Sequence, residues 1–385
     1  MVEREVIRRI IIEGQEFVNE ISLTERPFFF EQKGNYVFVG IRQAGKSYLL
    51  YQRIQQLLRE EHNINEIVYI NFDDERLRQM TADDLDLILQ AYHSLFDLRP
   101  LLFFDEIQNI EGWEHFARRL ANQKYNIYIT GSNAKMLSRE IATTLGGRFW
   151  NKDVYPYSFA EYLNARNIIL SKNWMYGKQA AEVSKAFNDY FLYGGFPELT
   201  DVIAKRVWLN DIYSKIFFSD LILRNKVRNE EALGLLVRRL AENVKQPISY
   251  TRLANLISSI GIKISKATVI EFIRYLKESC LIFPIENYAA KFAERNSNMK
   301  HYFIDNGLLS IFLLDGNTSL LENIVAIHLY KRYGAQLYFY NQNIEVDFII
   351  PEAKTAIQVS YSLMDETTCR REVEGLIKLN RVFPM

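Results

Sequence analysis

Short, continuously apolar runs alternate along the N-terminal part of the chain with stretches whose apolar residues recur at helical spacing. Such runs are typical of strands that are buried on both faces of a parallel sheet, and they lie at residues 36–39, 101–104 and 126–130. Residues 47–60 repeat apolar side chains every three or four positions, which predicts a helix after the first strand. The pattern predicts an α/β domain over residues 26–158, preceded by an amphipathic N-terminal helix within residues 1–25.

Residues 159–228 are helical in pattern and rich in aromatic side chains. Residues 193–197, Tyr-Gly-Gly-Phe-Pro, interrupt this pattern, because two glycines and a proline cannot continue a helix. The interruption is interpreted as a corner between two helices, with a hinge as the alternative.

A winged helix is predicted over residues 229–312. Ser249 and Ser265 are placed to cap its second and third helices, and Gly261 makes the turn between them. The third helix would enter a DNA groove, and the side chains that it would present there are Lys266, Thr268, Arg274 and Lys277. Glu271 and Glu278 dilute that charge, so DNA binding and docking of a protein partner both stay open.

Residues 40–47 read Gly-Ile-Arg-Gln-Ala-Gly-Lys-Ser and match the phosphate-binding pattern G-x-x-x-x-G-K-[ST]. Such a loop between a strand and a helix start directs backbone N–H groups at a phosphate. Lys46 would reach the β- and γ-phosphates, and the Ser47 hydroxyl would bind Mg²⁺. The nucleotide site is predicted to comprise Gly40, Ile41, Arg42, Gln43, Ala44, Gly45, Lys46, Ser47 and Tyr48.

A pair of carboxylates follows the second apolar run. Asp105 at the strand end could hold Mg²⁺, and Glu106, one residue further on, could activate an attacking water. A polar pair follows the third run, where Ser132 and Asn133 could sense the γ-phosphate or cap the next helix. Arg148 could stabilise charge during phosphoryl transfer, although its spacing alone favours an ordinary surface arginine.

These motifs resemble those of prokaryotic AAA-type ATPases of the STAND or archaeal-ATPase kind, which carry a C-terminal nuclease-like domain. The matching stretches cover residues 40–47, 105–113, 129–134, 147–148, 155–159 and 193–198. The resemblance implies ATP as the nucleotide and a strand inserted between the P-loop strand and the Asp105 strand. It also implies a helical lid over residues 159–228 and a role for Arg148 as phosphate sensor or arginine finger.

The order of helix and strands in residues 313–385 resembles the restriction-endonuclease-like fold, whose site combines Glu, Asp and a Glu-x-Lys triplet. Glu322 and Asp347 stand at the first two positions, but Gln358 and Ser360 replace the triplet's acid and base. Gln lacks the charge of a metal ligand and Ser lacks an ammonium group. An inactive nuclease-like domain is therefore expected. Family members usually continue with more strands after the helix at residues 371–380, so the domain is also expected to be incomplete.

Composition adds few constraints. Lys plus Arg and Asp plus Glu number 47 each, so no overall basic charge indicates nucleic acid. The two cysteines, Cys280 and Cys369, suit a reducing cytoplasm, and no apolar run approaches the ~20 residues of a membrane span.

The sequence therefore predicts a cytoplasmic, Mg²⁺-dependent ATPase that couples its nucleotide state to a conformational change. Arg148 would act within one chain or across the interface of a homo-oligomer. A slow nucleotide-gated switch that binds a protein partner is the alternative, and an ATP-regulated nuclease is disfavoured by Gln358 and Ser360.

Overall fold

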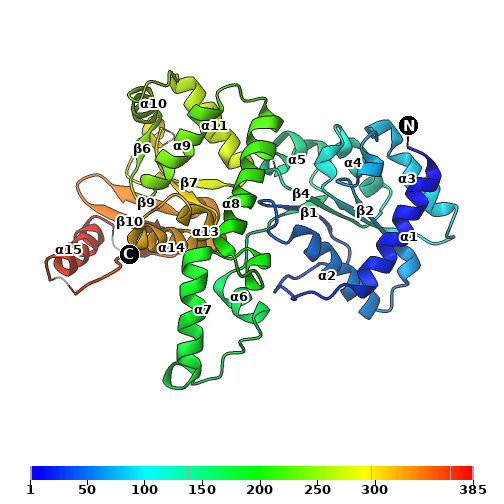
Figure 1. Cartoon of the computed structure of the whole chain (residues 1–385), viewed down its shortest axis with the longest axis horizontal. Helices are drawn as coiled ribbons and strands as arrows, with labels where there is room; N and C mark the ends of the chain where they lie inside the picture. The colour runs from blue at the N-terminus through cyan, green and yellow to red at the C-terminus, as the bar shows by residue number, and fades with distance from the viewer. Residues whose placement is uncertain (1, 138, 296, 365, 384–385) are drawn as a thin grey trace. The chain divides into compact units, whose positions relative to one another are not determined.

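A five-stranded parallel sheet forms the centre of the first of two structural units, Met1–Tyr155 and Pro156–Met385, in the computed structural model (Figure 1). The structure describes residues 2–137, 139–295, 297–364 and 366–383. The helices and strands of the first unit are α1 Arg4–Glu20, β1 Asn35–Val39, α2 Lys46–Arg59, β2 Ile67–Asn71, α3 Asp86–His93, β3 Leu101–Asp105, α4 Trp113–Asn122, β4 Ile127–Gly131, α5 Arg139–Leu145 and β5 Phe149–Asp153.

The strand order is β2-β3-β4-β1-β5, so β4 lies between the P-loop strand β1 and the Asp105 strand β3. This is the arrangement that the resemblance implies. Because all neighbouring strands are parallel, the ends of β1, β3 and β4 lie at one edge of the sheet. The sequence-predicted site residues that follow these strands are thereby brought together.

Alternating side chains place helices on the two faces of this sheet. Phe103 stacks on Tyr128 at 4.7 Å between ring centroids, and the Tyr128 hydroxyl accepts a hydrogen bond from Arg53 of α2 at 3.3 Å. The next residue, Phe104, points to the opposite face and lies 6.0 Å from the ring of Phe116 in α4. Strands buried on both faces explain the apolar runs in the sequence.

The second unit contains a mixed six-stranded sheet of order β11-β10-β9-β7-β8-β6. Its elements are α6 Phe159–Ala165, α7 Gln179–Tyr193, α8 Lys205–Lys215, a π-helix Ile216–Leu223, α9 Glu230–Glu242, β6 Ile248–Ser249, α10 Tyr250–Ser258, α11 Lys266–Glu278, β7 Ile282–Asn287, α12 Phe292–Arg295, β8 Asn298–Phe303, α13 Asn306–Ser310, α14 Asn317–Tyr333, β9 Tyr338–Asn341, β10 Glu345–Ile350, β11 Thr355–Ile357 and α15 Glu366–Val382.

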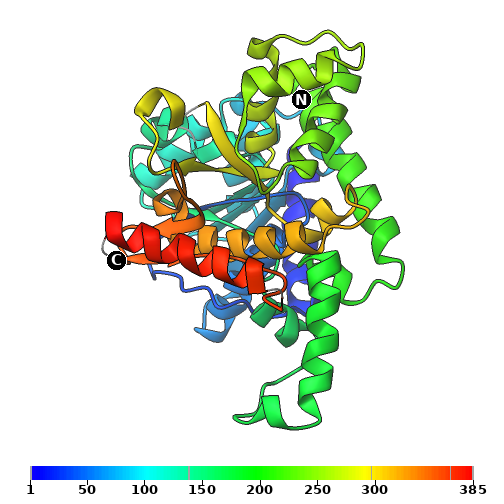
Figure 2. The same ribbon diagram turned by 90° about the vertical axis from the view of Figure 1, so that its left-hand side faces the viewer.

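This sheet crosses the domain boundary that was expected at residue 312. Strand β7, predicted within 229–312, pairs in parallel with β9, predicted within 313–385, through Glu286↔Tyr338 and Asn287↔Phe339. An exposed edge of the β7–β8 hairpin offers unpaired backbone groups, and β9 uses them. The last helix, α15, packs beside this sheet through Leu379, which joins Tyr340 and Val346 in a buried cluster (Figure 2).

The interruption at residues 193–197 is a corner fixed by hydrogen bonds. Gly194 has φ 79°, and the N–H of Gly195 donates to Asp305 at 2.7 Å. The Gly195 carbonyl accepts the N–H of Tyr157 at 2.7 Å. These bonds favour the interpretation as a helix–helix corner. Among the described residues, no helix is both long and apolar enough to cross a membrane.

Candidate nucleotide site

The glycine-rich loop between β1 and α2 depends on two of its glycines. A Cβ atom on Gly40 would lie 1.9 Å from the carbonyl oxygen of Val154, so only glycine fits there. Gly45 precedes α2 with φ 89°, and Gln43 also has a positive φ of 61°. The loop therefore leads directly into the N-terminus of α2, where backbone N–H groups and the helix dipole attract an anion.

Lys46 is the first residue of α2, and its side chain is buried at the end of the loop. Its ammonium donates to the carbonyl of Ile41 at 3.1 Å and lies 3.6 Å from Oε1 of Glu106. The P-loop lysine is thereby joined to the second carboxylate of the Asp105–Glu106 pair.

Asp105 is almost fully buried at the end of β3. Its carboxylate accepts hydrogen bonds from the hydroxyls of Tyr69, at 2.8 Å, and Thr130, and the Ser47 hydroxyl lies close enough to lower its pKa. Burial, and after it the charge of Glu106, raise the pKa of Asp105, although these hydroxyl bonds oppose the shift. The two predicted metal ligands, Ser47 and Asp105, are thus in contact, and a hydroxyl with a carboxylate suits Mg²⁺.

Glu106 adopts the left-handed backbone conformation, with φ 52°, which is uncommon for a residue other than glycine. Its N–H donates to the Thr130 hydroxyl at 2.9 Å, and its Oε2 accepts from Ser132 at 3.0 Å and from Gln108. Burial would raise the pKa of Glu106, but Lys46 and these hydrogen bonds lower it below its usual value. Both carboxylate oxygens of Glu106 are therefore engaged.

Ser132 and Asn133 follow β4 at the same edge of the sheet. The contact between Ser132 and Glu106 favours a position within the site for Ser132. Asn133 is half-buried, and its carbonyl accepts the N–H of Met136 at 3.0 Å at the start of a 3-10 turn, Ala134–Leu137.

The remaining loop residues occupy different environments. Ile41 and Ala44 are buried, and the Ala44 carbonyl accepts from Arg26 at 3.2 Å. Arg42 is half-buried, and its charge contributes to the lowered pKa of Glu106. Tyr48 is half exposed, and its ring packs edge-on against Tyr51.

Arg148, which was expected to act on the nucleotide of its own chain or of a neighbouring one, does not join this cluster. It directly precedes β5, and β5 pairs with β1 in the register Asn35↔Phe149 to Val39↔Asp153. Because the strands are parallel, Arg148 lies at the opposite end of β1 from Gly40, about 20 Å away for six residues of ~3.3 Å each. Arg148 is exposed there, and its guanidinium donates to the carbonyl of Gly146 at 3.2 Å.

Three side chains of this site were not singled out from the sequence. Thr130 connects Asp105 and Glu106, Tyr69 donates to Asp105, and Gln108 donates to Glu106. Thr130 and Gln108 lie within the motif stretches at residues 129–134 and 105–113. Thr130 could have been singled out because it is a polar residue at the end of a buried strand. Tyr69 has no such signal, because only the pairing of β2 with β3 brings it to Asp105.

A second polar cluster in the second unit contains the predicted nuclease-like residues. Glu322 of α14 and Asp347 of β10 are both buried, and both contact Lys300 of β8, at 3.2 Å and 3.3 Å. The Gln358 side chain accepts the Asp347 N–H at 3.2 Å, and Ser360 donates to the carbonyl of Ser362 at 2.9 Å. Lys300 was missed, because nothing in the sequence connects β8 with α14 and β10.

Glu322→Gln is expected to change how stability depends on pH. Burial raises the pKa of Glu322 to about 7 from 4.5, although Lys300 opposes the shift. A carboxyl group whose pKa is higher in the folded than in the unfolded protein stabilises the fold at pH values below its unfolded-state pKa. This contribution is lost as the pH rises through the folded-state pKa of about 7. Relative to the variant, the wild-type free energy of unfolding should fall by about 1–3 kcal/mol between about pH 5 and pH 8.

Urea unfolding of both proteins across this pH range measures the difference. Asp305, whose pKa burial raises to about 6, titrates in the same range in both proteins and cancels in the comparison. Parallel pH profiles for wild type and variant would show that Glu322 does not titrate there.

A comparison with known protein families agrees with the P-loop geometry. A sequence profile described as an AAA domain matches residues 32–163, and one described as a domain of unknown function (DUF8612) matches residues 184–319. In solved structures, the Walker-type ATPase paby2304 of Pyrococcus abyssi aligns with a TM-score of 0.45 and 14% identity, covering 81% of this chain and 96% of that one.

Two relatives match nearly the whole chain. The uncharacterized protein MJ1544 of Methanocaldococcus jannaschii is 33% identical over 390 residues, covering 98% of this chain and 86% of the relative. An uncharacterized protein of Haemophilus influenzae is 30% identical over 354 residues, covering 89% of this chain and 86% of the relative. The chain contains an AAA-type P-loop ATPase domain and belongs to the same protein family as these two relatives.

Proposed function

We propose that this protein is a Mg²⁺-dependent ATPase that couples its nucleotide state to a conformational change. One observation carries the proposal: the buried Lys46 ammonium lies 3.6 Å from Glu106, where the phosphate-binding loop meets the ends of β3 and β4. The lysine that would bind phosphate and the carboxylate that would activate water are therefore neighbours. Ser47 and Asp105 would hold Mg²⁺, which would polarise the transferred phosphoryl group when bound.

The ion pair also suggests how ATP binding prepares the site for hydrolysis. The phosphates of ATP would compete with Glu106 for the Lys46 ammonium, because both are anions within its reach. Losing this counter-ion would raise the pKa of Glu106 and make it a stronger base for water. Ser132 and Gln108 would keep the carboxylate oriented through their bonds to Oε2.

The same contacts favour slow basal turnover, since both carboxylate oxygens of Glu106 are engaged before ATP arrives. A second candidate function is therefore a slow nucleotide-gated switch that binds a protein partner. Turnover separates the two: a coupled motor accelerates when its partner is present, and a switch stays slow.

Arg148 is proposed to act across an interface in a homo-oligomer. Its position at the opposite end of β1 from Gly40 keeps it away from its own chain's phosphates. Its exposure leaves it available to a neighbouring copy, in which an arginine finger would stabilise the transition state.

The second unit is proposed to contain the helical lid, the winged helix and the nuclease-like fold. Helices α9, α10 and α11 followed by the β7–β8 hairpin support the winged helix, and Ser249 and Ser265 cap α10 and α11 as predicted. Lys266, Arg274 and Lys277 are exposed on α11, which supports DNA contact, although Arg274 lies 3.8 Å from Glu271.

Phosphate release from ATP tests this proposal, with and without duplex DNA and with the metal removed by EDTA. We expect hydrolysis that EDTA abolishes and that DNA accelerates. Hydrolysis indifferent to DNA would favour the slow switch, and the absence of hydrolysis under all conditions would refute the proposed ATPase activity.

If Arg148 acts across an interface, Arg148→Ala and Glu106→Gln proteins are each inactive alone, but their mixture recovers hydrolysis. A mixture without recovery would contradict that role.

A further inference from the structure

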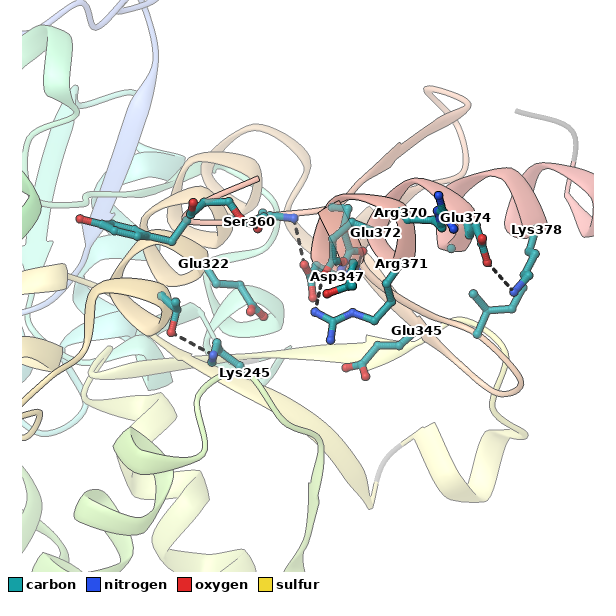
Figure 3. A pocket seen from close by; sticks show the side chains of 18 of the residues that line it. Lys245, Glu322, Glu345, Asp347, Ser360, Arg370, Arg371, Glu372, Glu374 and Lys378 are labelled. Atoms are coloured by element: carbon teal, nitrogen blue, oxygen red, sulfur yellow. Dashed lines mark hydrogen bonds and ion pairs between the residues drawn. The ribbon is translucent and has the colours of Figure 1, made fainter. Parts of the chain in front are cut away.

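Lys300 is a fully buried lysine of the second unit, and the three carboxylates around it line a pocket of about 1060 Å³. Its ammonium lies 3.2 Å from Glu322, 3.3 Å from Asp347 and 3.7 Å from Glu345. Figure 3 shows these three acidic residues around the pocket, which α15 lines with Arg370 and Arg371. One cation is therefore held among three carboxylates.

A divalent ion in a nuclease-like site would need oxygen ligands at about 2.0–2.6 Å, and several of the oxygens present here already accept hydrogen bonds. Oε1 of Glu322 accepts from Lys300 and, at 2.7 Å, from the Tyr302 hydroxyl. Oδ2 of Asp347 accepts the N–H of Val359 at 3.0 Å. The Gln358 oxygen is bonded to the backbone of Asp347.

The described part of the chain contains no group of three or more His, Cys, Asp or Glu arranged to hold a metal. The metal that the nuclease-like resemblance implies therefore does not fit these residues as they stand. The Lys300 ammonium occupies the centre that such an ion would require.

We propose that Lys300 is a built-in cation that replaces a divalent metal ion in this pocket. The buried carboxylates need a positive charge, because isolated buried anions are unstable, and a lysine supplies it permanently. The ring of Phe339, 5.6 Å from the ammonium, adds a further favourable contact. The pocket is then independent of metal and does not hydrolyse phosphodiesters, and the divalent-ion requirement of the protein resides in the first unit.

The proposal predicts that removing Lys300 lets Glu322, Glu345 and Asp347, which are not arranged to hold a metal as they stand, close around a divalent ion. Lys300→Met keeps an apolar stem beside Phe339 and leaves the three carboxylates without a cation. Mn²⁺ binding is measured without nucleotide in an Asp105→Asn background, which silences the predicted metal site of the first unit. We expect no Mn²⁺ at the pocket when Lys300 is present, one per chain with Lys300→Met, and none when Asp347→Asn is added.

Thermal unfolding provides a second measurement. Mn²⁺ at ~100 times its Kd should raise the melting temperature of the Lys300→Met protein by about 5–10 °C and leave the Lys300 protein unchanged. A folded Lys300→Met protein without an Asp347-dependent Mn²⁺ site would overturn the proposal.

If Lys300→Met folds poorly, the protein with Lys300 intact still decides the matter. Mn²⁺ binding to that protein that Asp347→Asn abolishes would show that the pocket is a metal site with Lys300 beside it, and would overturn the proposal. Mn²⁺-dependent DNA cleavage lost with Asp347→Asn would do the same. If neither the protein with Lys300 intact nor its Asp347→Asn variant binds Mn²⁺ at the pocket, the result supports the proposal.

Discussion

Glu106→Gln is expected to reduce the kcat of ATP hydrolysis by about 10²–10⁴-fold, the usual contribution of a general base. The amide keeps the size of the side chain and an oxygen that can accept from Ser132, but it cannot take a proton from water. ATP binding should persist, because the loop and Lys46 are unchanged. Steady-state phosphate release and equilibrium ATP binding measure the two effects separately.

Glu111→Gln is the matched control, since Glu111 is an exposed carboxylate that follows Glu106 closely in the sequence. It should leave kcat within about twofold of wild type, as surface changes away from a site usually do. A Glu106→Gln protein that keeps more than about a tenth of wild-type turnover would show that another group activates water.

Lys46→Met is expected to weaken ATP binding by about 10–100-fold, because a charge-assisted hydrogen bond contributes about 1.5–3 kcal/mol. The loss should be larger for ATP than for adenosine, since Lys46 is proposed to contact only phosphate. Hydrolysis should fall with it. The variant also leaves the Glu106 carboxylate without its nearest cation, so the pKa of Glu106 should rise.

Titration of ATP into wild type and variant measures the change in Kd. Lys33→Met, an exposed lysine that precedes β1, removes the same charge outside the loop and should bind ATP normally. Unchanged ATP affinity in the Lys46→Met protein would mean that the nucleotide binds elsewhere or that the loop amides alone suffice.

The clustering of the candidate nucleotide-site residues was predictable largely because they follow strand ends. Lys46, Asp105, Glu106 and Ser132 each stand directly after, or within a few residues of, a buried strand. The parallel sheet then brings strand ends to one edge without further information. Motif spacing identified these residues, and the resemblance supplied the insertion of β4 between β1 and β3.

Contacts between distant segments were not predictable in the same way. Arg148 stands near β5 in sequence, but only the register of β5 on β1 shows that it is far from Gly40. Lys300 is separated from Asp347 by 47 positions, and a lone lysine in a strand carries no pattern of its own. The parallel pairing of β7 with β9 joins the edges of two strands that are distant in sequence, and the spacing of apolar residues does not predict such pairing.

Phosphate release from ATP with Mg²⁺, measured against ATP concentration for wild type, Glu106→Gln and Lys46→Met, tests the central claim most directly. The account predicts saturable hydrolysis by wild type, a collapse of kcat without loss of binding for Glu106→Gln, and weakened binding for Lys46→Met. Wild-type hydrolysis that survives both substitutions, or no hydrolysis with intact ATP binding, would contradict it.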